Sequence, residues 1–296
     1  MLQPASRNVI MANDRPAAAG GVDQLATDLW RVTAQNASPL TGPGTNSYVL
    51  GESRLVIIDP GPDDPAHRQA LLQVIDGRPV GGIILTHAHR DHSDGARDLA
   101  LHLEAPLMAL GDARTGRSAR MQAFVADGTL TEGAATDYAL MPDVVLADGD
   151  TVTIDRDGMQ VIHTPGHLSH HICLKWRDIV FTGDHIMGWS STVVVAPDGD
   201  MAQYIESLRR LERRLSDGPK VIGLAGHGDV IPDLLPRITA LYHHRQDREK
   251  AILAAIAAGK KSLSDITLAA YPGLSAALLP FAEKSCHAHL LALEED

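Results

Sequence analysis

The sequence predicts an α/β fold, and three observations support this prediction. Short apolar runs, typical of buried strands, alternate with longer segments in which apolar residues recur at helical spacing. Several of the short runs end in a glycine-containing turn followed by His or Asp, so the reactive side chains lie at strand ends. The chain has 296 residues with 44% hydrophobic content, enough for one large core and a smaller one. We therefore expect a large α/β domain followed by a small helical domain.

The N-terminal part of the chain predicts a lead-in and then strands. Residues 1–22 are rich in Ala, Gly and Pro and lack periodicity, so we expect a flexible segment before a main domain at 23–233. Strands are expected near 29–32, 47–50 and 55–58, with a turn-rich loop at 41–46 and a helix at 66–75. Asp59 follows the third strand, where two roles fit it equally well: orienting a metal ligand or forming an Asx turn before Pro60.

The apolar run 83–85 leads into a cluster of metal-ligand side chains. Residues 86–92 read Thr-His-Ala-His-Arg-Asp-His. In an extended segment His87, His89 and Asp91 point to the same side, and the chain must turn for His92 to join them. Imidazole and carboxylate are ligands that zinc and iron favour. The alternative is a surface loop that is merely rich in His and Asp, but an unpaired cluster at the end of a buried strand is costly to desolvate. The cluster therefore predicts a metal site.

Three later strands end in the same way. The run 160–163 leads to His167, the run 179–181 leads to Asp184, and the run 221–224 leads to His227. In each case a glycine lies next to the ligand-type residue, as a turn at a sheet edge requires. These residues are expected to converge on the site formed by the 86–92 cluster.

Helical patterns account for much of the remaining chain. The segment 98–141 reads as largely helical, and residues 201–211 have apolar side chains at helical spacing. Four arginines at 209, 210, 213 and 214 are expected to form a solvated helix face rather than a binding strip. Residues 234–296 show no strand pattern: we expect helices at 234–258 and 274–293, and a short helix opened by a capping box at 262–265. These form the small C-terminal domain.

Composition limits the classes of function. The net charge of −11 disfavours a general polyanion binder, although it allows a local basic groove. Two cysteines cannot form a disulfide framework, and Cys173 is expected in the core. No apolar run is long enough for a membrane span, and the N-terminus lacks the pattern of a secretory signal. We therefore expect a cytoplasmic protein without membrane contact.

Taken together, these motifs resemble the metallo-β-lactamase superfamily, whose signature is H-x-H-x-D-H with further ligands after later strands. Residues 41–48, 183–190, 197–201 and 244–249 extend the resemblance along nearly the whole chain, toward the branch of beta-lactamase-like protein 2 and, more distantly, glyoxalase II. The resemblance implies an αββα sandwich as the catalytic domain at 23–233. It also implies a winged-helix-like domain at 234–296, whose β-wing is expected to be missing.

The resemblance also implies a dinuclear site, expected to hold two Zn²⁺ ions, with iron or manganese as alternatives. The first ion is assigned to His87, His89 and His167, the second to Asp91, His92 and His227, and Asp184 bridges both. Such a pair supplies a bridging hydroxide near neutral pH. Asp91 and Asp184 are thus the expected catalytic carboxylates, and they offset part of the metal charge. His171, His185 and Trp189 are expected near the substrate, with packing as the alternative role for each.

Several functions remain open from the sequence. The favoured one is a hydrolase of an ester, thioester or related acyl bond in a small molecule, for which a β-lactam is a further candidate substrate. The same site also fits a phosphodiesterase acting on single-stranded RNA, against which the acidic charge weighs mildly. A mononuclear iron oxygenase of the persulfide dioxygenase kind and a non-catalytic module with a structural metal are the remaining alternatives. The sequence leaves open the physiological substrate and whether the chain forms a homo-oligomer.

Overall fold

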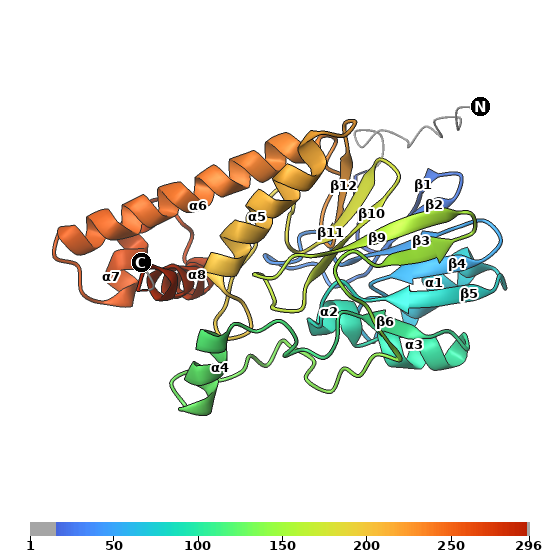
Figure 1. Cartoon of the computed structure of the whole chain (residues 1–296), viewed down its shortest axis with the longest axis horizontal. Helices are drawn as coiled ribbons and strands as arrows, with labels where there is room; N and C mark the ends of the chain where they lie inside the picture. The colour runs from blue at the N-terminus through green and yellow to red at the C-terminus, as the bar shows by residue number, and fades with distance from the viewer. Residues whose placement is uncertain (1–15, 295–296) are drawn as a thin grey trace.

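Two β-sheets pack face to face with helices on their outer faces (Figure 1). The computed structural model describes residues 16–294, so residues 1–15 of the expected lead-in lie outside the described residues. One sheet has seven strands in the order β1-β2-β3-β4-β5-β6-β7, and the other has five in the order β12-β11-β10-β9-β8. This αββα sandwich confirms the predicted fold class.

The strands lie close to the predicted positions. The strands are β1 (Val22–Ala26), β2 (Leu29–Thr33), β3 (Asn46–Leu50), β4 (Leu55–Ile58), β5 (Val80–Ile84), β6 (Leu107–Ala109), β7 (Val144–Val145), β8 (Thr151–Ile154), β9 (Asp157–His163), β10 (Ile172–Trp176), β11 (Ile179–Gly183) and β12 (Ile222–Ala225). The helices are α1 (Pro65–Ile75), α2 (Arg90–Ser93), α3 (Ala96–His102), α4 (Ala119–Ala126), α5 (Met201–Ser216), α6 (Leu234–Ala257), α7 (Leu263–Ala270) and α8 (Leu279–Leu293).

The period-two alternation of the strands builds three hydrophobic layers. Tyr48 of β3 and Phe181 of β11 point into the core between the sheets, where their rings meet edge to face at 5.1 Å. Val49, the next residue along β3, points to the other face, into the layer covered by α1 and α3. Val180 of β11 points outward into the layer covered by α5 and α6. Each sheet therefore buries both faces.

The predicted helical segment at 98–141 is mostly irregular, so this expectation was wrong. Within it the structure contains the end of α3, the short strand β6 and the helix α4, joined by turns. Gly111 and Gly116 have φ values of +153° and +79°, which end regular helical structure. Asp112 also accepts hydrogen bonds from the Arg114 amide and the Thr115 hydroxyl, which stabilise a local turn instead.

The C-terminal region is helical, as predicted, and has a small core of its own. Ile252 of α6, Ile266 of α7 and Cys286 of α8 pack together there. Ser262 caps α7 by accepting a hydrogen bond from the Asp265 amide at 3.1 Å, while α8 begins at Leu279, five residues later than expected. Residues 234–294 contain no strand. Among the described helices, none has the length and apolar character needed to cross a membrane.

The topology brings several strand ends to one edge of the sandwich. β5 runs parallel to β4 in the larger sheet, and β12 runs parallel to β11 in the smaller sheet. Asn46 of β3 joins the larger sheet to the segment that follows β12 of the smaller sheet. Its main-chain N–H donates to Gly226 O at 2.7 Å, and its side-chain Nδ2 donates to Gly228 O at 2.9 Å. The segments that follow β5, β11 and β12 are therefore held side by side.

Candidate metal centre

The structure brings together every residue predicted as a metal ligand. The segment after β5 supplies His87, His89, Asp91 and His92, and the short helix α2 makes the turn that carries His92 into the site. His167, Asp184 and His227 arrive from the segments after β9, β11 and β12. Their ligand atoms form two groups, defined here as the first ligand set, consisting of His87, His89, His167 and Asp184, and the second ligand set, consisting of Asp91, His92 and His227.

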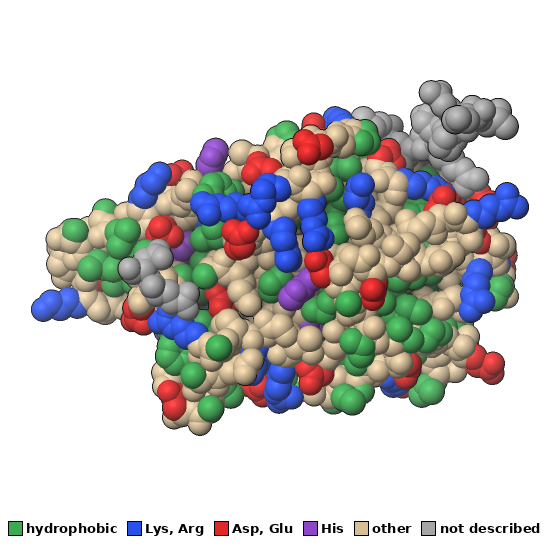
Figure 2. All heavy atoms as spheres, viewed as in Figure 1, with side chains coloured by type: hydrophobic (Ala, Val, Ile, Leu, Met, Phe, Trp, Pro, Cys, Tyr) green, Lys and Arg blue, Asp and Glu red, His purple; other side chains and the backbone are tan. Residues whose placement is uncertain are grey.

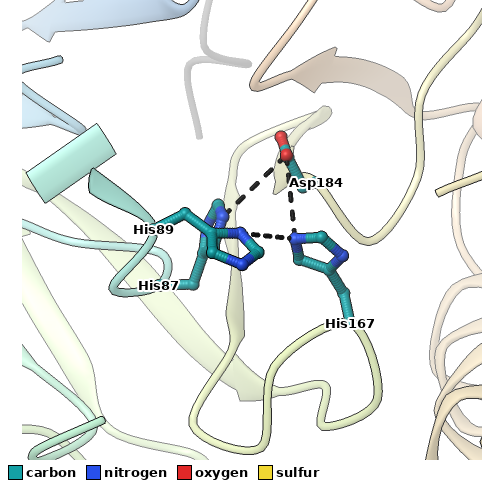
Figure 3. Close-up of side chains that lie close together, drawn as sticks. All are labelled: His87, His89, His167 and Asp184. Atoms are coloured by element: carbon teal, nitrogen blue, oxygen red, sulfur yellow. Dashed lines mark hydrogen bonds and ion pairs between the residues drawn. The ribbon is translucent and has the colours of Figure 1, made fainter. Parts of the chain in front are cut away.

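In the first ligand set the side chains face a common point (Figure 3). His167 Nε2 lies 2.9 Å from His89 Nδ1 and 3.7 Å from Asp184 Oδ2. His87 Nε2 lies 3.9 Å from the same carboxylate oxygen. Three ring nitrogens and one carboxylate oxygen converge there, which is a donor set that zinc and other first-row metals accept.

The second ligand set converges on the same carboxylate. His227 Nε2 lies 3.4 Å from Asp91 Oδ2 and 3.4 Å from His92 Nε2. Asp184 joins this set as well, since its Oδ2 is 3.2 Å from His227 Nε2 and its Oδ1 is 3.4 Å from His92 Nε2. Asp184 is thus close to histidines of both sets.

Asp59 organises two of the ligand histidines from behind. It accepts hydrogen bonds from His92 Nδ1 at 3.0 Å and from the Thr86 hydroxyl at 2.6 Å and amide at 2.7 Å. Because the Thr86 hydroxyl donates to Asp59, it accepts from His87 Nδ1 at 2.9 Å. In the neutral form of either ring, the proton then lies on Nδ1, and the lone pair on Nε2 faces the site. Of the two roles considered for Asp59, orienting a metal ligand describes its contacts.

Main-chain carbonyls orient two further ligands. His167 Nδ1 lies 2.9 Å from Val193 O and 2.8 Å from the Thr192 hydroxyl. His227 Nδ1 lies 3.2 Å from Gly44 O, in the glycine-rich loop at 41–46. A carbonyl accepts from the Nδ1 proton, so in the neutral form of either ring Nε2 carries the lone pair and faces the site.

Two threonine hydroxyl groups contact the candidate ligands, and no sequence motif predicted them as site residues. Thr45 donates to Asp91 Oδ2 at 3.0 Å, and Thr192 contacts His167 as described above. Thr45 at least lies in the turn-rich loop that the sequence singled out, whereas Thr192 lies in the irregular segment just after the motif at 183–190. Contacts of this kind depend on tertiary structure alone.

Burial keeps the histidines of the first ligand set neutral. It lowers the pKa of His87 well below its ordinary value, the pKa of His89 to about 4 and the pKa of His167 to about 3. These imidazoles are therefore uncharged near pH 7. A neutral imidazole offers the lone pair that a metal ion requires.

The second ligand set favours positive charge. Although burial lowers it, the Asp91 and Asp184 carboxylates raise the pKa of His92 well above its ordinary value. Burial likewise opposes the rise in the pKa of His227, which comes mainly from Asp184. Burial would raise the pKa of Asp184, but His227 and His92 hold it well below its usual range. The carboxylates thus create a potential that attracts cations.

Two glycines allow this close approach. An added Cβ at Gly226 would lie 2.4 Å from Asp184 Oδ1 and 2.7 Å from a carbon of the His92 ring. At Gly183, where φ is +46°, it would lie 2.5 Å from His171 Nε2 and 2.7 Å from the Thr86 hydroxyl. The glycines noted beside the ligands in the sequence are therefore required by space as well as by the turn.

The residues present fit a metal pair. His87 Nε2 and Asp184 Oδ1 are buried and have no hydrogen-bond partner among the described residues, yet both point toward other ligand atoms. Unpartnered buried polar atoms are costly, and a metal ion at each set would satisfy them. Asp91 and Asp184 would also offset part of the charge of two divalent ions.

The three residues predicted near the substrate occupy different environments. His171 and His185 are both fully buried, with their rings 5.5 Å apart, and His171 lies 5.2 Å from the ring of His87. In this structure they pack beneath the site, so a substrate arriving from solvent does not reach them. Trp189 is 48% exposed and lies against Gly42 and Gly228, the residue after His227.

Trp189 also lines a pocket of about 560 Å³ beside the His227 segment. The walls include Pro43, Val230 and Ile231, together with the half-buried side chain of Arg237 from α6. The lining is mostly apolar with few polar groups, as is usual for pockets that hold small organic molecules. Trp189 thus lines this pocket and lies beside Gly228, the residue that follows His227.

Comparison with known proteins agrees with the fold and the site. Residues 40–227 match the model of the metallo-beta-lactamase superfamily. A beta-lactamase-like protein 2 homolog from Drosophila melanogaster is 30% identical over 93% of this chain and 90% of its own length. An atrochrysone carboxyl ACP thioesterase from Paecilomyces divaricatus is 29% identical over 79% of this chain and 66% of its own length.

Among solved structures, a beta-lactamase domain protein from Burkholderia ambifaria is similar over 94% of this chain and 89% of its own, with 25% identity and a TM-score of 0.73. The matched family region contains all the converging His and Asp residues. The chain therefore belongs to the metallo-β-lactamase superfamily and is a metallo-hydrolase.

Proposed function

We propose that this protein is a dinuclear metallo-hydrolase that cleaves an ester, thioester or related acyl bond in a small molecule. The observation that carries the proposal is that the Asp184 carboxylate lies 3.2–3.7 Å from histidines of both ligand sets. His87, His89 and His167 would hold one ion, Asp91, His92 and His227 the other, and Asp184 would contact both. Zinc is the expected metal, since imidazole and carboxylate suit it, with iron and manganese as alternatives.

A bound metal pair supplies a hydroxide nucleophile near neutral pH and polarises the oxygen of the scissile group. The chain's own residues prepare the site for this chemistry. Asp59, Gly44 O and Val193 O fix the ring orientation of the histidines through their Nδ1 protons. Asp91 and Asp184 provide negative charge in a buried setting, where it acts strongly on a cation.

The substrate class is inferred from the pocket and from the relatives. The pocket lined by Trp189 is of a size suited to a small molecule and is mostly apolar, so it suits the apolar part of an acyl substrate. The relative from Paecilomyces divaricatus is named as a thioesterase. An acyl bond presents a carbonyl carbon that a hydroxide nucleophile can attack. The pocket and the relatives are needed for this inference because the fold alone does not specify the substrate.

The surface gives less support to the single-stranded RNA alternative. Figure 2 shows Lys and Arg side chains gathered over α5, where the sequence placed four arginines. Two of these are paired with carboxylates: Arg213 with Glu206 at 2.8 Å and Arg214 with Asp148 at 2.7 Å. Their charge is thus partly neutralised within the chain, as expected for a solvated helix face.

Elemental analysis of the purified protein, combined with a substrate panel, tests the proposal. The panel contains a thioester, a bis-aryl phosphodiester and a single-stranded RNA oligonucleotide. About two zinc ions per chain with turnover of the thioester are expected. About one iron ion per chain without hydrolysis would instead support the dioxygenase alternative, and turnover of RNA alone would support the nuclease alternative.

A variant of the pocket wall tests whether the substrate binds in the pocket lined by Trp189. Trp189→Ala removes the exposed indole at the pocket wall without touching a ligand, so KM for an apolar thioester should rise about tenfold while kcat changes little. Val145→Ala, which shortens an exposed apolar side chain outside the pocket lining, is the control. Equal KM values in the two variants would place substrate binding elsewhere.

A further inference from the structure

The segment 187–193, which follows the bridging ligand, is held by two arginines of α6. Arg237 donates through Nε to Met187 O at 2.7 Å and through Nη2 to Ser190 O at 2.7 Å. Arg245 donates through Nη2 to Thr192 O. The two arginines are eight residues apart, which is about 12 Å along the axis of α6. They therefore secure the segment at separate points along its length.

The far end of this segment orients a metal ligand. Thr192 and Val193 supply the hydroxyl and the carbonyl that lie 2.8 Å and 2.9 Å from His167 Nδ1. The same residue, Thr192, offers its main-chain carbonyl to Arg245. A continuous series of hydrogen bonds thus leads from α6 in the C-terminal region to a ring of the first ligand set.

The type of residue at position 245 is informative. Arg245 is only 1% exposed, its Nε has no hydrogen-bond partner, and none of the ion pairs between described residues includes it. Its guanidinium lies 5.1 Å from the ring centre of Tyr204, which also donates to His185 O at 3.0 Å. Burying a cation without a carboxylate is costly, and an apolar side chain would fill the same volume at lower cost. Packing alone does not account for an arginine here.

We propose that Arg245 is a positioning residue of the metal centre, which makes α6 part of the scaffold of the site. By fixing the Thr192 carbonyl, Arg245 keeps the Thr192 hydroxyl and the Val193 carbonyl against His167 Nδ1. His167 then presents Nε2 to the other ligands of its set. This inference rests on the proposed function, because it requires His167 to bind a metal ion.

The expected effect follows from the distance to the ligand. Loss of a group that contacts a ligand directly weakens metal binding about 10–100-fold. Arg245 acts through one further residue, so Arg245→Met should weaken binding by about tenfold, the lower end of that range.

Arg248 provides a matched control on the same helix. Its guanidinium donates to Ala270 O and lies 5.1 Å from the ring centre of Tyr271, so it makes the same kinds of contact as Arg245. Those contacts stay within the C-terminal region, on α7 and the residue after it. Arg248→Met therefore tests whether any disturbance of this region weakens the metal centre.

The experiment is titration of the metal-free full-length protein with Co²⁺, monitored by visible absorption, together with chemical unfolding of each variant. Arg245→Met should bind Co²⁺ about tenfold more weakly than the wild type, and Arg248→Met should bind it equally well even if it is less stable. Equal affinity of Arg245→Met and the wild type would overturn the inference, as would equal losses in the two variants.

A second pair of variants covers the case in which Arg245→Met does not fold. Arg245→Lys keeps the charge but shortens the reach to Thr192 O, so a smaller loss of Co²⁺ affinity is expected than for methionine, with none for Arg248→Lys. Equal affinities of the two lysine variants would refute the positioning role. If the wild-type protein itself binds no Co²⁺, the proposed function fails, which separates that failure from failure of this inference alone.

Discussion

Replacing Asp59 by asparagine tests how the outer hydrogen bonds support the metal centre. Asp59 has a φ of +50°, a conformation that asparagine also adopts readily, so the backbone is not expected to change. Asp59 Oδ2 accepts from both the Thr86 hydroxyl and His92 Nδ1. In the variant an NH₂ group replaces that oxygen and cannot accept from either donor.

The magnitude follows from these two bonds. Asp59 is 2% exposed, so water does not replace the lost acceptor. A buried donor left without a partner costs about 1–3 kcal/mol, and two of them give about 2–6 kcal/mol of unfolding free energy in the metal-free protein. If His92 instead moves its proton to Nε2, the lone pair that faces the second ligand set is lost. Zinc affinity is then expected to fall about 10–100-fold.

Two assays measure these effects. Urea unfolding in the presence of a chelator gives the stability of the metal-free protein, and competition with a chromogenic chelator gives the zinc affinity. Asp155→Asn is the control, because Asp155 also accepts several hydrogen bonds, from the loop 52–54, but is exposed to water. It should cost less than about 1 kcal/mol. If Asp59→Asn is as stable as this control and binds zinc like the wild type, the assigned role of Asp59 is wrong.

Three further predictions follow from the site and the surface. His87→Ala removes a residue of the first ligand set, so metal content and thioester hydrolysis should fall together. Hydrolysis should fall at least about 100-fold. Full metal content with full activity would contradict the assignment of His87 as a ligand. Gly226→Ala places a Cβ 2.4 Å from Asp184 Oδ1 and should displace this carboxylate. Elemental analysis should therefore show less metal in Gly226→Ala than in the control Gly218→Ala, where the added Cβ makes only an ordinary contact at 3.5 Å. At Asp155, hydrogen bonds from the loop 52–54 lower the pKa from 3.8 to about 2, so this carboxylate stabilises the fold above pH 3.8 and the stabilisation is lost as pH falls toward 2. The stability difference between wild type and Asp155→Asn should therefore shrink over that range in acid unfolding, and a constant difference would refute the assignment.

Local sequence patterns were sufficient to predict an α/β fold and the His and Asp residues that converge, whereas the αββα arrangement and the two ligand sets were implied by the family resemblance. Alternation at period two and helical spacing are properties of short segments, so strands such as β3, β4 and β11 could be placed from apolar runs alone. The ligand residues share a pattern of apolar run, glycine and His or Asp, which is also local. The segment 98–141 misled the prediction because its glycines and its Asp112 turn stop helices that the composition favours.

The sequence by itself thus determined the αββα class and which His and Asp residues meet. Tertiary structure decided how they meet: Asp184 lies close to both ligand sets because β11 and β12 run parallel, and Asp59 reaches His92 because β4 pairs with β5. It also decided that Arg245, on a helix distant in sequence, contacts the segment that orients His167. Such contacts join residues far apart in the chain, and their formation depends on the packing of whole layers, which no local pattern encodes.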